Sequence, residues 1–330
     1  MNRNTVEDIK RSPMPELEEP YETEKNEDCK AEEFKSNLCQ WAINNDSFYA
    51  LGKTTKHLPP GYYAYSWDND VHKIVFTKKG VITDDILQLP DPTLNDILID
   101  FQKFWHKRNL YEKYKYTYKR AYLMFGPAGC GKTSLISLLA KELISKNGII
   151  LNINANHQLG NYDMAIKDIR TIEKDKPIIV IIEDIDGYTE TDYVSILLNI
   201  LDGVYQTDNV IIIATTNYPE KLEERFSSRP SRFDVRVLID LPTADVRKFY
   251  IESKLKPDDL SEIDIDEWIK HTEGFTLDHL KELILLTFVL ENDFDESLVK
   301  IKEMIKNIKI KAVSIKRQKE SIGFDSGKEK

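Results

Sequence analysis

Residues 126–133 read GPAGCGKT and have the spacing of a phosphate-binding loop, G-x-x-x-x-G-K-[ST]. A predicted strand precedes this loop and a predicted helix follows it, as the motif requires. Its glycines let backbone N–H groups wrap around phosphates, and the helix N-terminus adds a positive dipole. We expect Lys132 to reach the β- and γ-phosphates of ATP and Thr133 to bind Mg²⁺. The residues expected to hold the nucleotide are Gly126, Pro127, Ala128, Gly129, Cys130, Gly131, Lys132, Thr133 and Ser134.

Two adjacent carboxylates follow a run of five branched apolar residues in "IIVIIEDIDGYTE", residues 178–190. The run predicts a buried strand, along which side chains alternate, so one acid faces the phosphate loop and the next an attacking water. We expect Glu183 to hold Mg²⁺ together with Thr133, and Asp184 to polarise the water. The order of Glu before Asp alters the reach by one methylene at each position. A degenerate site and a solvated strand end are the alternatives.

A polar residue and two arginines follow the next apolar strand. Asn217 ends "IIIATTN", where an amide could orient water beside the γ-phosphate. Arg229 and Arg232 lie three residues apart in "RFSSRPSRFD", and arginines supplied to phosphoryl transfer accelerate it by roughly 10³–10⁵. Without the other motifs, we would interpret Asn217 as a turn residue and the two arginines as a solvated surface pair.

The elements that must position these residues alternate along the chain. Apolar runs predict strands over 121–125, 149–155, 177–183 and 209–217, and helical spacing predicts helices over 132–146, 164–174 and 193–204. Strands and helices that alternate in this way form a parallel sheet with helices on both faces. We therefore predict an α/β P-loop NTPase sheet sandwiched by helices.

The rest of the chain divides into four further segments. Residues 1–33 carry eleven acids against five bases and are predicted to be a disordered acidic tail. Residues 34–90 are predicted to be a small α/β adaptor, with a helix over 34–43 and strands over 58–67 and 72–82. The core, 91–242, is expected to begin with one helix over 92–114 and Thr93 as its N-cap. A helical lid over 243–312 and a basic polar tail over 313–330 complete the prediction.

Composition excludes several classes of protein. A net charge of −10 does not favour binding to nucleic acid. The three cysteines are odd in number and lack metal-ligand spacing, which argues against a disulfide framework and a cysteine metal site. No apolar run approaches the roughly 18–20 residues of a membrane span. These observations, with no signal peptide recognised, predict a cytoplasmic protein without a membrane anchor, in the host cytoplasm if the chain is viral.

Several motifs together resemble the AAA family of ATPases: "LMFGPAGCGKTSL", "IIVIIEDID", "LLNILDGVYQTDNVIIIATTN", "RPSRFD" and "TEGFTLDHLKEL". They follow the family's order over about residues 105–290. The resemblance implies the sensor-one role for Asn217, and it implies that Arg229 and Arg232 act on the site of a neighbouring subunit. It also implies ATP at the subunit interfaces of a ring, usually a hexamer.

The Glu-Asp order resembles the branch that contains the mitochondrial chaperone of respiratory complex III assembly, whose members are active, so we interpret the pair as competent. Three departures limit what the resemblance implies. No membrane span is present, so the mitochondrial role does not transfer. "GFTLDHL" lacks the arginine of a second sensor, and "NANHQLGNYD" lacks an aromatic–hydrophobic–Gly pore loop. The segment before the core has a pattern found in bacterial and phage AAA proteins.

Three functions remain open. The first is an oligomeric ATPase that remodels a protein partner. The second is a DNA-transaction ATPase, suggested by the interleaved basic and aromatic residues of 103–120, although an amphipathic linker helix is favoured there. The third is a nucleotide-gated scaffold with slow hydrolysis. The six histidines show no metal spacing, and a nucleotide contact of His279 is a further hypothesis.

Overall fold

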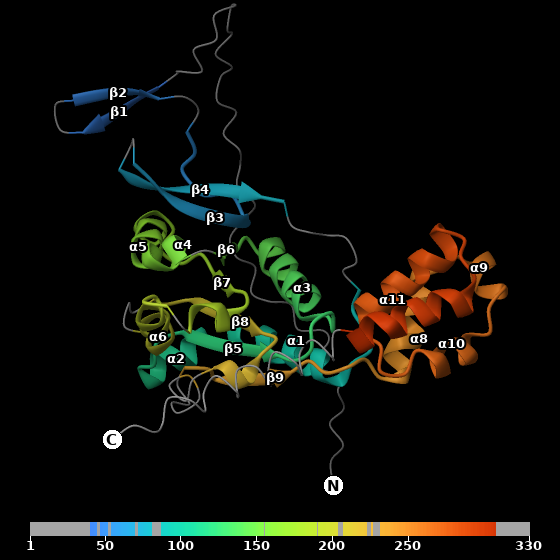
Figure 1. Ribbon diagram of the computed structural model, residues 1–330. Helices are drawn as coiled ribbons and strands as arrows, with labels where there is room; N and C mark the ends of the chain where they lie inside the picture. The colour runs from blue at the N-terminus through green and yellow to red at the C-terminus, as the bar shows by residue number, and fades with distance from the viewer. Residues whose placement is uncertain are drawn as a thin grey trace, which may run out of the picture.

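The computed structural model describes residues 40–307 except 45–46, 52–53, 70–71, 81–86, 155, 190, 204–206, 223–225 and 227–231, and it describes no side chain before residue 54. Its centre is a seven-stranded sheet with the spatial order β4-β3-β6-β7-β8-β5-β9 (Figure 1). The strands are β3 (Gly61–Asp68), β4 (Lys73–Lys79), β5 (Lys119–Phe125), β6 (Ile149–Ile153), β7 (Ile178–Ile182), β8 (Val210–Thr216) and β9 (Val235–Leu238). The predicted tails lie outside the described residues.

The central strands are parallel and buried on both faces. Every residue of β7 and β8 is buried, and Ile182 of β7 pairs with Ala214 of β8. Continuous runs of Ile and Val are what a parallel sheet covered on both sides requires. The carboxyl ends of these strands therefore meet at one edge of the sheet, and the predicted α/β fold is confirmed.

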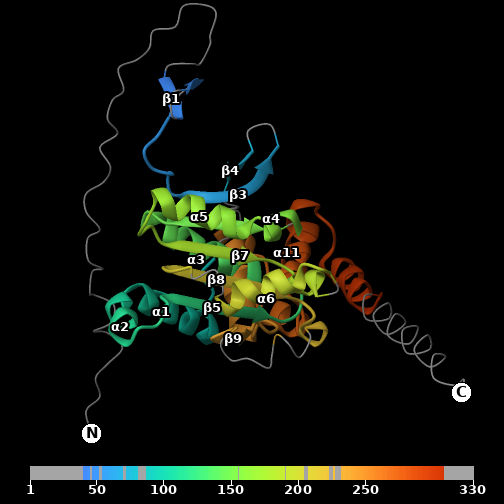
Figure 2. The same cartoon turned by 90° about the vertical axis from the view of Figure 1, so that its left-hand side faces the viewer.

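Helices cover the two faces of the sheet (Figures 1 and 2). One face packs against α1 (Pro92–Trp105), α3 (Lys132–Ser145) and helices of the lid. The other packs against α4 (Asn156–Gly160), α5 (Tyr162–Ile172) and α6 (Val194–Asp202). The α3 helix begins directly after the phosphate loop, so its packing fixes the direction in which the loop points.

The predicted separate adaptor over 34–90 is wrong for strands β3 and β4. Strand β3 pairs in parallel with β6, with Tyr62 opposite Ile150, and β4 pairs antiparallel with β3. The two strands thus extend the sheet at its β6 edge. Alternation of apolar residues in "GYYAYSWD" identified the strand but not its partner, because one buried face suits any sheet edge.

Buried polar contacts fasten this extension to the helices beneath it. The Tyr65 hydroxyl donates to the carbonyl of Gln158 in α4 at 2.7 Å, and the Gln158 amide donates to the Tyr65 carbonyl at 3.0 Å. The carboxylate of Glu173 accepts the N–H of Leu58 at 2.6 Å and lies 3.5 Å from Lys176. Buried pairs of this kind fix one arrangement, so the extension packs as part of the same unit as the central sheet.

Four local predictions need correction. A short hairpin, β1 (Gln40–Asn44) and β2 (Ser47–Leu51), replaces the end of the helix predicted over 34–43. The helix predicted over 92–114 is broken into α1 and α2 (Arg108–Tyr114). Its N-cap is Asp91, not Thr93, because the Asp91 carboxylate accepts the first free N–H groups and Pro92 starts the helix. The strand β9 and the short α4 were not predicted.

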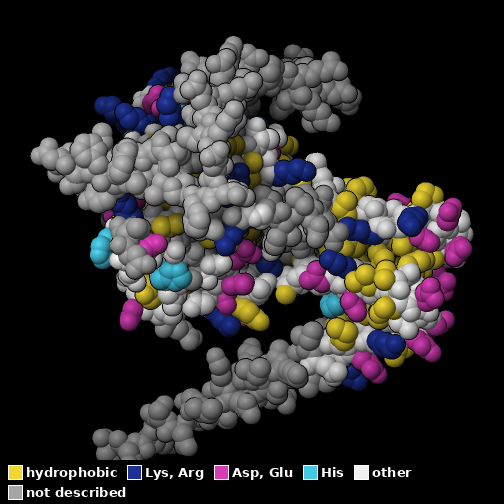
Figure 3. Space-filling model, turned by 90° about the horizontal axis from the view of Figure 1, so that it is seen from above, with side chains coloured by type: hydrophobic (Ala, Val, Ile, Leu, Met, Phe, Trp, Pro, Cys, Tyr) yellow, Lys and Arg dark blue, Asp and Glu magenta, His cyan; other side chains and the backbone are white. Residues whose placement is uncertain are grey.

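The lid contains α8 (Ala244–Lys254), α9 (Pro257–Ser261), α10 (Ile265–His271) and α11 (Leu277–Ile284), a π-helical turn over Leu285–Val289 and a helix over 294–307. It projects from one end of the sheet (Figure 1). Figure 3 shows hydrophobic side chains on its surface among acidic ones. No helix within the described ranges is long and apolar enough to cross a lipid bilayer.

Candidate nucleotide-binding site

The phosphate loop requires glycine at its first position. Gly126 has φ +143°, and a Cβ there would lie 2.1 Å from the carbonyl oxygen of Ile239. Any other residue at position 126 would force β5 and the segment after β9 apart, so only glycine allows the loop to start this close to the neighbouring backbone. The loop turns back on itself, since Nζ of Lys132 donates to the carbonyls of Gly126 at 2.9 Å and Pro127 at 2.8 Å.

One pocket of about 220 Å³ brings most of the predicted residues together. It is lined by part of the loop and by the polar ends of β7 and β8, together with one lid residue. The lining residues are Ala128, Gly129, Gly131, Lys132, Thr133, Ser134, Glu183, Asp184, Thr215, Asn217 and Asp278. Gly126 and Pro127 contribute through their bonds to Lys132.

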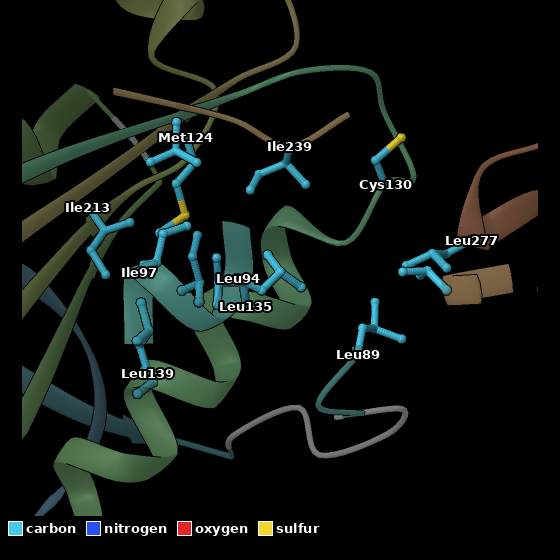
Figure 4. Packing of buried hydrophobic residues seen from close by; sticks show 14 of the residues in the cluster. Leu89, Leu94, Ile97, Met124, Cys130, Leu135, Leu139, Ile213, Ile239 and Leu277 are labelled. Atoms are coloured by element: carbon cyan, nitrogen blue, oxygen red, sulfur yellow. The ribbon is translucent and has the colours of Figure 1, made fainter. Parts of the chain in front are cut away.

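Cys130 lies on the loop but turns its side chain away from this pocket. Its thiol is buried in the apolar cluster that contains Leu89 and Leu277 (Figure 4). Burial raises the pKa of the Cys130 thiol to about 11, with Lys132 opposing the shift. Because the thiolate is the reactive form, burial and the raised pKa favour a packing role for this cysteine over redox sensing.

Glu183 and Thr133 meet at the mouth of the loop. The Thr133 hydroxyl donates to Oε2 of Glu183 at 3.3 Å. Burial raises the pKa of Glu183, while the Thr133 hydrogen bond lowers it and the charge of Asp184 raises it further. A hydroxyl and a carboxylate side by side are hard oxygen donors, which suit Mg²⁺. These two residues therefore fit the metal site predicted for them.

Asp184 adopts an unusual backbone conformation, with φ +49° and ψ +54°. Its N–H donates to Oγ1 of Thr215 at 3.1 Å, and its Oδ1 accepts Nδ2 of Asn217 at 3.2 Å. The left-handed turn after the strand brings both acids of the pair into the pocket instead of placing them on opposite faces. Aspartate tolerates this conformation better than glutamate does, which gives a physical reason for the Glu-Asp order.

The third acid of the motif has a structural contact. Oδ1 of Asp186 accepts the hydroxyl of Thr216 at 2.6 Å, and Lys221 lies 3.9 Å from its Oδ2. Asp186 does not line the pocket. It fixes the turn after β7 to the end of β8, so that Asp184 and Asn217 remain neighbours.

Of the two predicted arginines, Arg232 is described, and it is not among the residues that line this pocket. Arg232 forms a two-pronged ion pair with Asp202, at the end of α6, at 2.8 and 2.9 Å. The pair is largely buried, with side chains 8% and 19% exposed. Arg229 lies outside the described residues. The structure therefore places Arg232 away from the phosphates that Lys132 would bind in the same chain.

Sequence reasoning missed two residues of the pocket, Thr215 and Asp278. Thr215 could have been found from "TTN", in which alternate side chains of β8 reach the same end. Asp278 lies in "GFTLDHL", where only the missing arginine was noted. The hypothesis of a nucleotide contact by His279 lacks support, because its ring caps α11 in a box with Thr276.

The basic and aromatic stretch over 103–120 is mostly committed to packing. The rings of Phe104 and Tyr118 stack with centroids 4.3 Å apart, and Trp105 and Tyr111 contact them. Arg108 is paired with Glu112 and with an acid after α5. Packed rings offer no face for base stacking, and four of the six rings in the stretch are packed while Tyr114 and Tyr116 are exposed, so the balance favours the linker interpretation.

Comparison with known proteins agrees with this geometry. The family described as "ATPase family associated with various cellular activities (AAA)" matches residues 122–241. Residues 122–241 are an AAA ATPase domain. The resemblance inferred from the motifs is thus confirmed, and the AAA domain covers the phosphate loop, the acid pair and Asn217.

Three relatives illustrate the similarity of the AAA domain to known proteins. "ATPase family gene 2 protein" of Saccharomyces cerevisiae is 32% identical over 158 residues, 43% of this chain and 20% of the yeast protein. "Cell division protein C" of Sulfolobus acidocaldarius is 30% identical over 54% of this chain and 53% of its own length. "Probable mitochondrial chaperone bcs1" of Schizosaccharomyces pombe is 34% identical over 50% of this chain and 39% of its own. The chain thus spans about half or less of these relatives.

Proposed function

We propose that this chain is an oligomeric AAA ATPase that hydrolyses ATP to remodel, assemble or disassemble a protein partner. The observation that carries the ATPase assignment is the meeting of Lys132, Thr133–Glu183 and Asp184–Asn217 in one pocket. Each lies where phosphoryl transfer needs it: a cation for phosphate, oxygen donors for a metal, and a carboxylate for the attacking water.

The residues divide the work as follows. Lys132 and the N–H groups of the loop hold the phosphates, and Thr133 with Glu183 would hold Mg²⁺. Bound there, Mg²⁺ supplies positive charge to the β- and γ-phosphate oxygens. Asp184 accepts a proton from the attacking water, while Nδ2 of Asn217 holds that carboxylate in place. Oδ1 of Asn217 is buried without a protein partner among the described residues, so we assign the role of Asn217 to its Nδ2 contact with Asp184.

Two observations support a shared site in a homo-oligomer, by analogy a hexameric ring. The described lining of the pocket contains one cation, Lys132, whereas phosphoryl transfer develops negative charge that arginines of a neighbour could neutralise. Arg229 is one candidate, and Arg232 is the other provided that assembly opens its pair with Asp202. The lid also exposes apolar side chains, including Val289 at 64% and Leu290 at 62%. Apolar side chains that gather on one surface, as Figure 3 shows on the lid, are typical of surfaces that bind another chain.

The names of the relatives support a protein partner, since one is a chaperone and another a "Proteasome-associated ATPase". A DNA-transaction ATPase is the second candidate, but the packed aromatics of 103–120 weaken it. A scaffold with slow hydrolysis is the third, and it is less favoured because the reversed acid pair that suggests it fits the left-handed turn at Asp184. Remodelling is therefore the proposal that we carry forward.

Subunit mixing tests the proposal. Asp184→Asn should lower turnover by about 10²–10⁴-fold while ATP still binds, and Arg232→Ala should also be inactive. Mixed in equal amounts, the two variants should regain about a quarter of wild-type activity, because some interfaces join an intact Asp184 to a neighbour's intact arginine. Arg232→Lys replaces Arg232→Ala if the latter does not fold. No recovery on mixing, with both variants folded and oligomeric, would refute a shared site.

A further inference from the structure

The lid places a carboxylate directly against the phosphate loop. The N–H of Asp278, in the first turn of α11, donates to the carbonyl of Gly129 at 3.3 Å. A Cβ on Gly129 would lie 2.8 Å from Oδ2 of Asp278, so the carboxylate is in contact with the loop. Figure 4 shows the adjacent Leu277 packed towards Cys130 of the loop. Asp278 also lines the pocket that we assign to the nucleotide.

Neighbouring contacts hold Asp278 in this position. Thr276 and His279 cap α11 by accepting hydrogen bonds from each other's N–H groups. Oγ1 of Thr276 would lie 3.0 Å from the same Cβ position on Gly129. The start of α11 therefore rests on the loop at two points, which fixes the backbone of Asp278 beside Gly129 while its side chain is exposed to solvent.

Asp278 changes the balance of charge in the pocket. The described lining contains Lys132 against Glu183, Asp184 and Asp278, which leaves a formal net charge of −2. The loop N–H groups and the helix N-termini attract phosphate, but a third carboxylate opposes them. A negative pocket repels a polyphosphate in proportion to the charge that the polyphosphate carries.

We infer that Asp278 determines which form of the nucleotide binds, by discriminating against free nucleotide in favour of the form bound to a divalent cation. This inference rests on the proposed nucleotide site. Free ATP carries about −4 charges and its Mg²⁺ complex about −2, so the carboxylate opposes the free form with about twice the free energy. Asp278 is thus a specificity-determining residue at the place where a second sensor would lie.

The test is the affinity for ATPγS, measured by calorimetry with excess Mg²⁺ and again with EDTA. Asp278→Asn should tighten binding about tenfold in EDTA and about threefold in Mg²⁺. Halving the charge of the ligand halves the repulsive free energy, and half of the free energy corresponds to the square root of the fold-change in affinity. The matched control is Asp266→Asn, the same substitution at the same second position of another lid helix, α10. The Asp266 side chain is 87% exposed and does not line the pocket, so this variant should match the wild type in both buffers.

Two results would overturn the inference. Equal gains in both buffers would show that the carboxylate does not distinguish the two forms, and weaker binding by Asp278→Asn would show that it holds the ligand. Lys132→Ala separates this failure from failure of the proposed function. If the wild type binds ATPγS no better than Lys132→Ala does, the nucleotide site itself is wrong and the inference fails with it.

Discussion

Nδ2 of Asn217 donates to Oδ1 of Asp184 at 3.2 Å, and this contact joins the ends of two neighbouring strands at the centre of the site. The amide leaves its own oxygen buried and without a protein partner among the described residues. One side chain thus holds the carboxylate with its nitrogen, while its oxygen stays buried. This arrangement explains why an amide follows β8.

Asn217→Ala should lower turnover roughly 10²-fold while ATP affinity changes little, because the substitution frees Asp184 without touching the phosphate loop. Asn217→Asp should be worse, since it brings a second carboxylate beside the first. It should also move the acidic limb of the pH–rate profile to higher pH, because adjacent carboxylates resist ionisation. Steady-state kinetics over a range of pH, with nucleotide binding as a control, measure both effects. An unshifted limb in Asn217→Asp would contradict the contact.

Glu183 should destabilise the nucleotide-free protein at neutral pH. Burial raises its pKa in the folded chain above the usual 4.5. The folded state then binds a proton more readily than the unfolded state, so stability falls as pH rises from 4.5 through the raised pKa, and the loss persists above it. Glu183→Gln removes this loss and should raise the melting temperature at pH 8 by about 1–3 °C.

Two controls accompany the Glu183 measurement. The gain should disappear as pH approaches 4, where the wild-type carboxyl is itself protonated. Added Mg²⁺ and ATP should stabilise the wild type more than Glu183→Gln, because the variant lacks the carboxylate ligand. A melting temperature lowered at every pH would show that the carboxylate contributes to folding instead of opposing it.

Arg232 should contribute to the stability of its own subunit as well as to turnover at the neighbouring subunit's site. Removing one partner of a buried ion pair leaves the other charge unpaired, so Arg232→Ala should cost about 2–4 kcal/mol of unfolding free energy. Arg232→Lys, which keeps the charge and loses the two-pronged geometry, should cost less. Urea denaturation at a subunit concentration below assembly measures both.

A double variant tests whether the Asp202 pair is the cause. Asp202→Asn should be less harmful in the Arg232→Ala background than in the wild type, because in that background Asp202 has already lost its partner and the substitution neutralises a stranded charge. Additive costs would show that the two side chains act independently. This measurement also shows how much lost activity in Arg232→Ala comes from the subunit itself.

The extent to which the sequence predicts the structure depends on how local the determining forces are. The Ile and Val runs of β7 and β8 predict a buried parallel sheet. The phosphate-loop motif predicts the strand before it and the helix after it. The partner of β3 could not be predicted, because β6 lies about ninety residues further along the chain. The left-handed turn at Asp184 and the approach of Asp278 depend on packing between distant elements, which no local pattern records.

The attachment of β3 yields a final prediction, that the extension and the AAA domain unfold together. Tyr65 is 1% exposed and its hydroxyl bonds across to Gln158, whereas the 2%-exposed Tyr63 donates to Pro59 within the extension itself. Tyr65→Phe should cost about 1 kcal/mol, because it removes one buried hydrogen bond from a carbonyl that keeps its bond to the N–H of Asn161, and should lower a single melting transition. That same transition should rise when ATPγS binds. Tyr63→Phe is the matched control for loss of a hydroxyl. The prediction would be contradicted by two melting transitions of which Tyr65→Phe lowers only the one that does not respond to nucleotide. That result would support a separately folded adaptor.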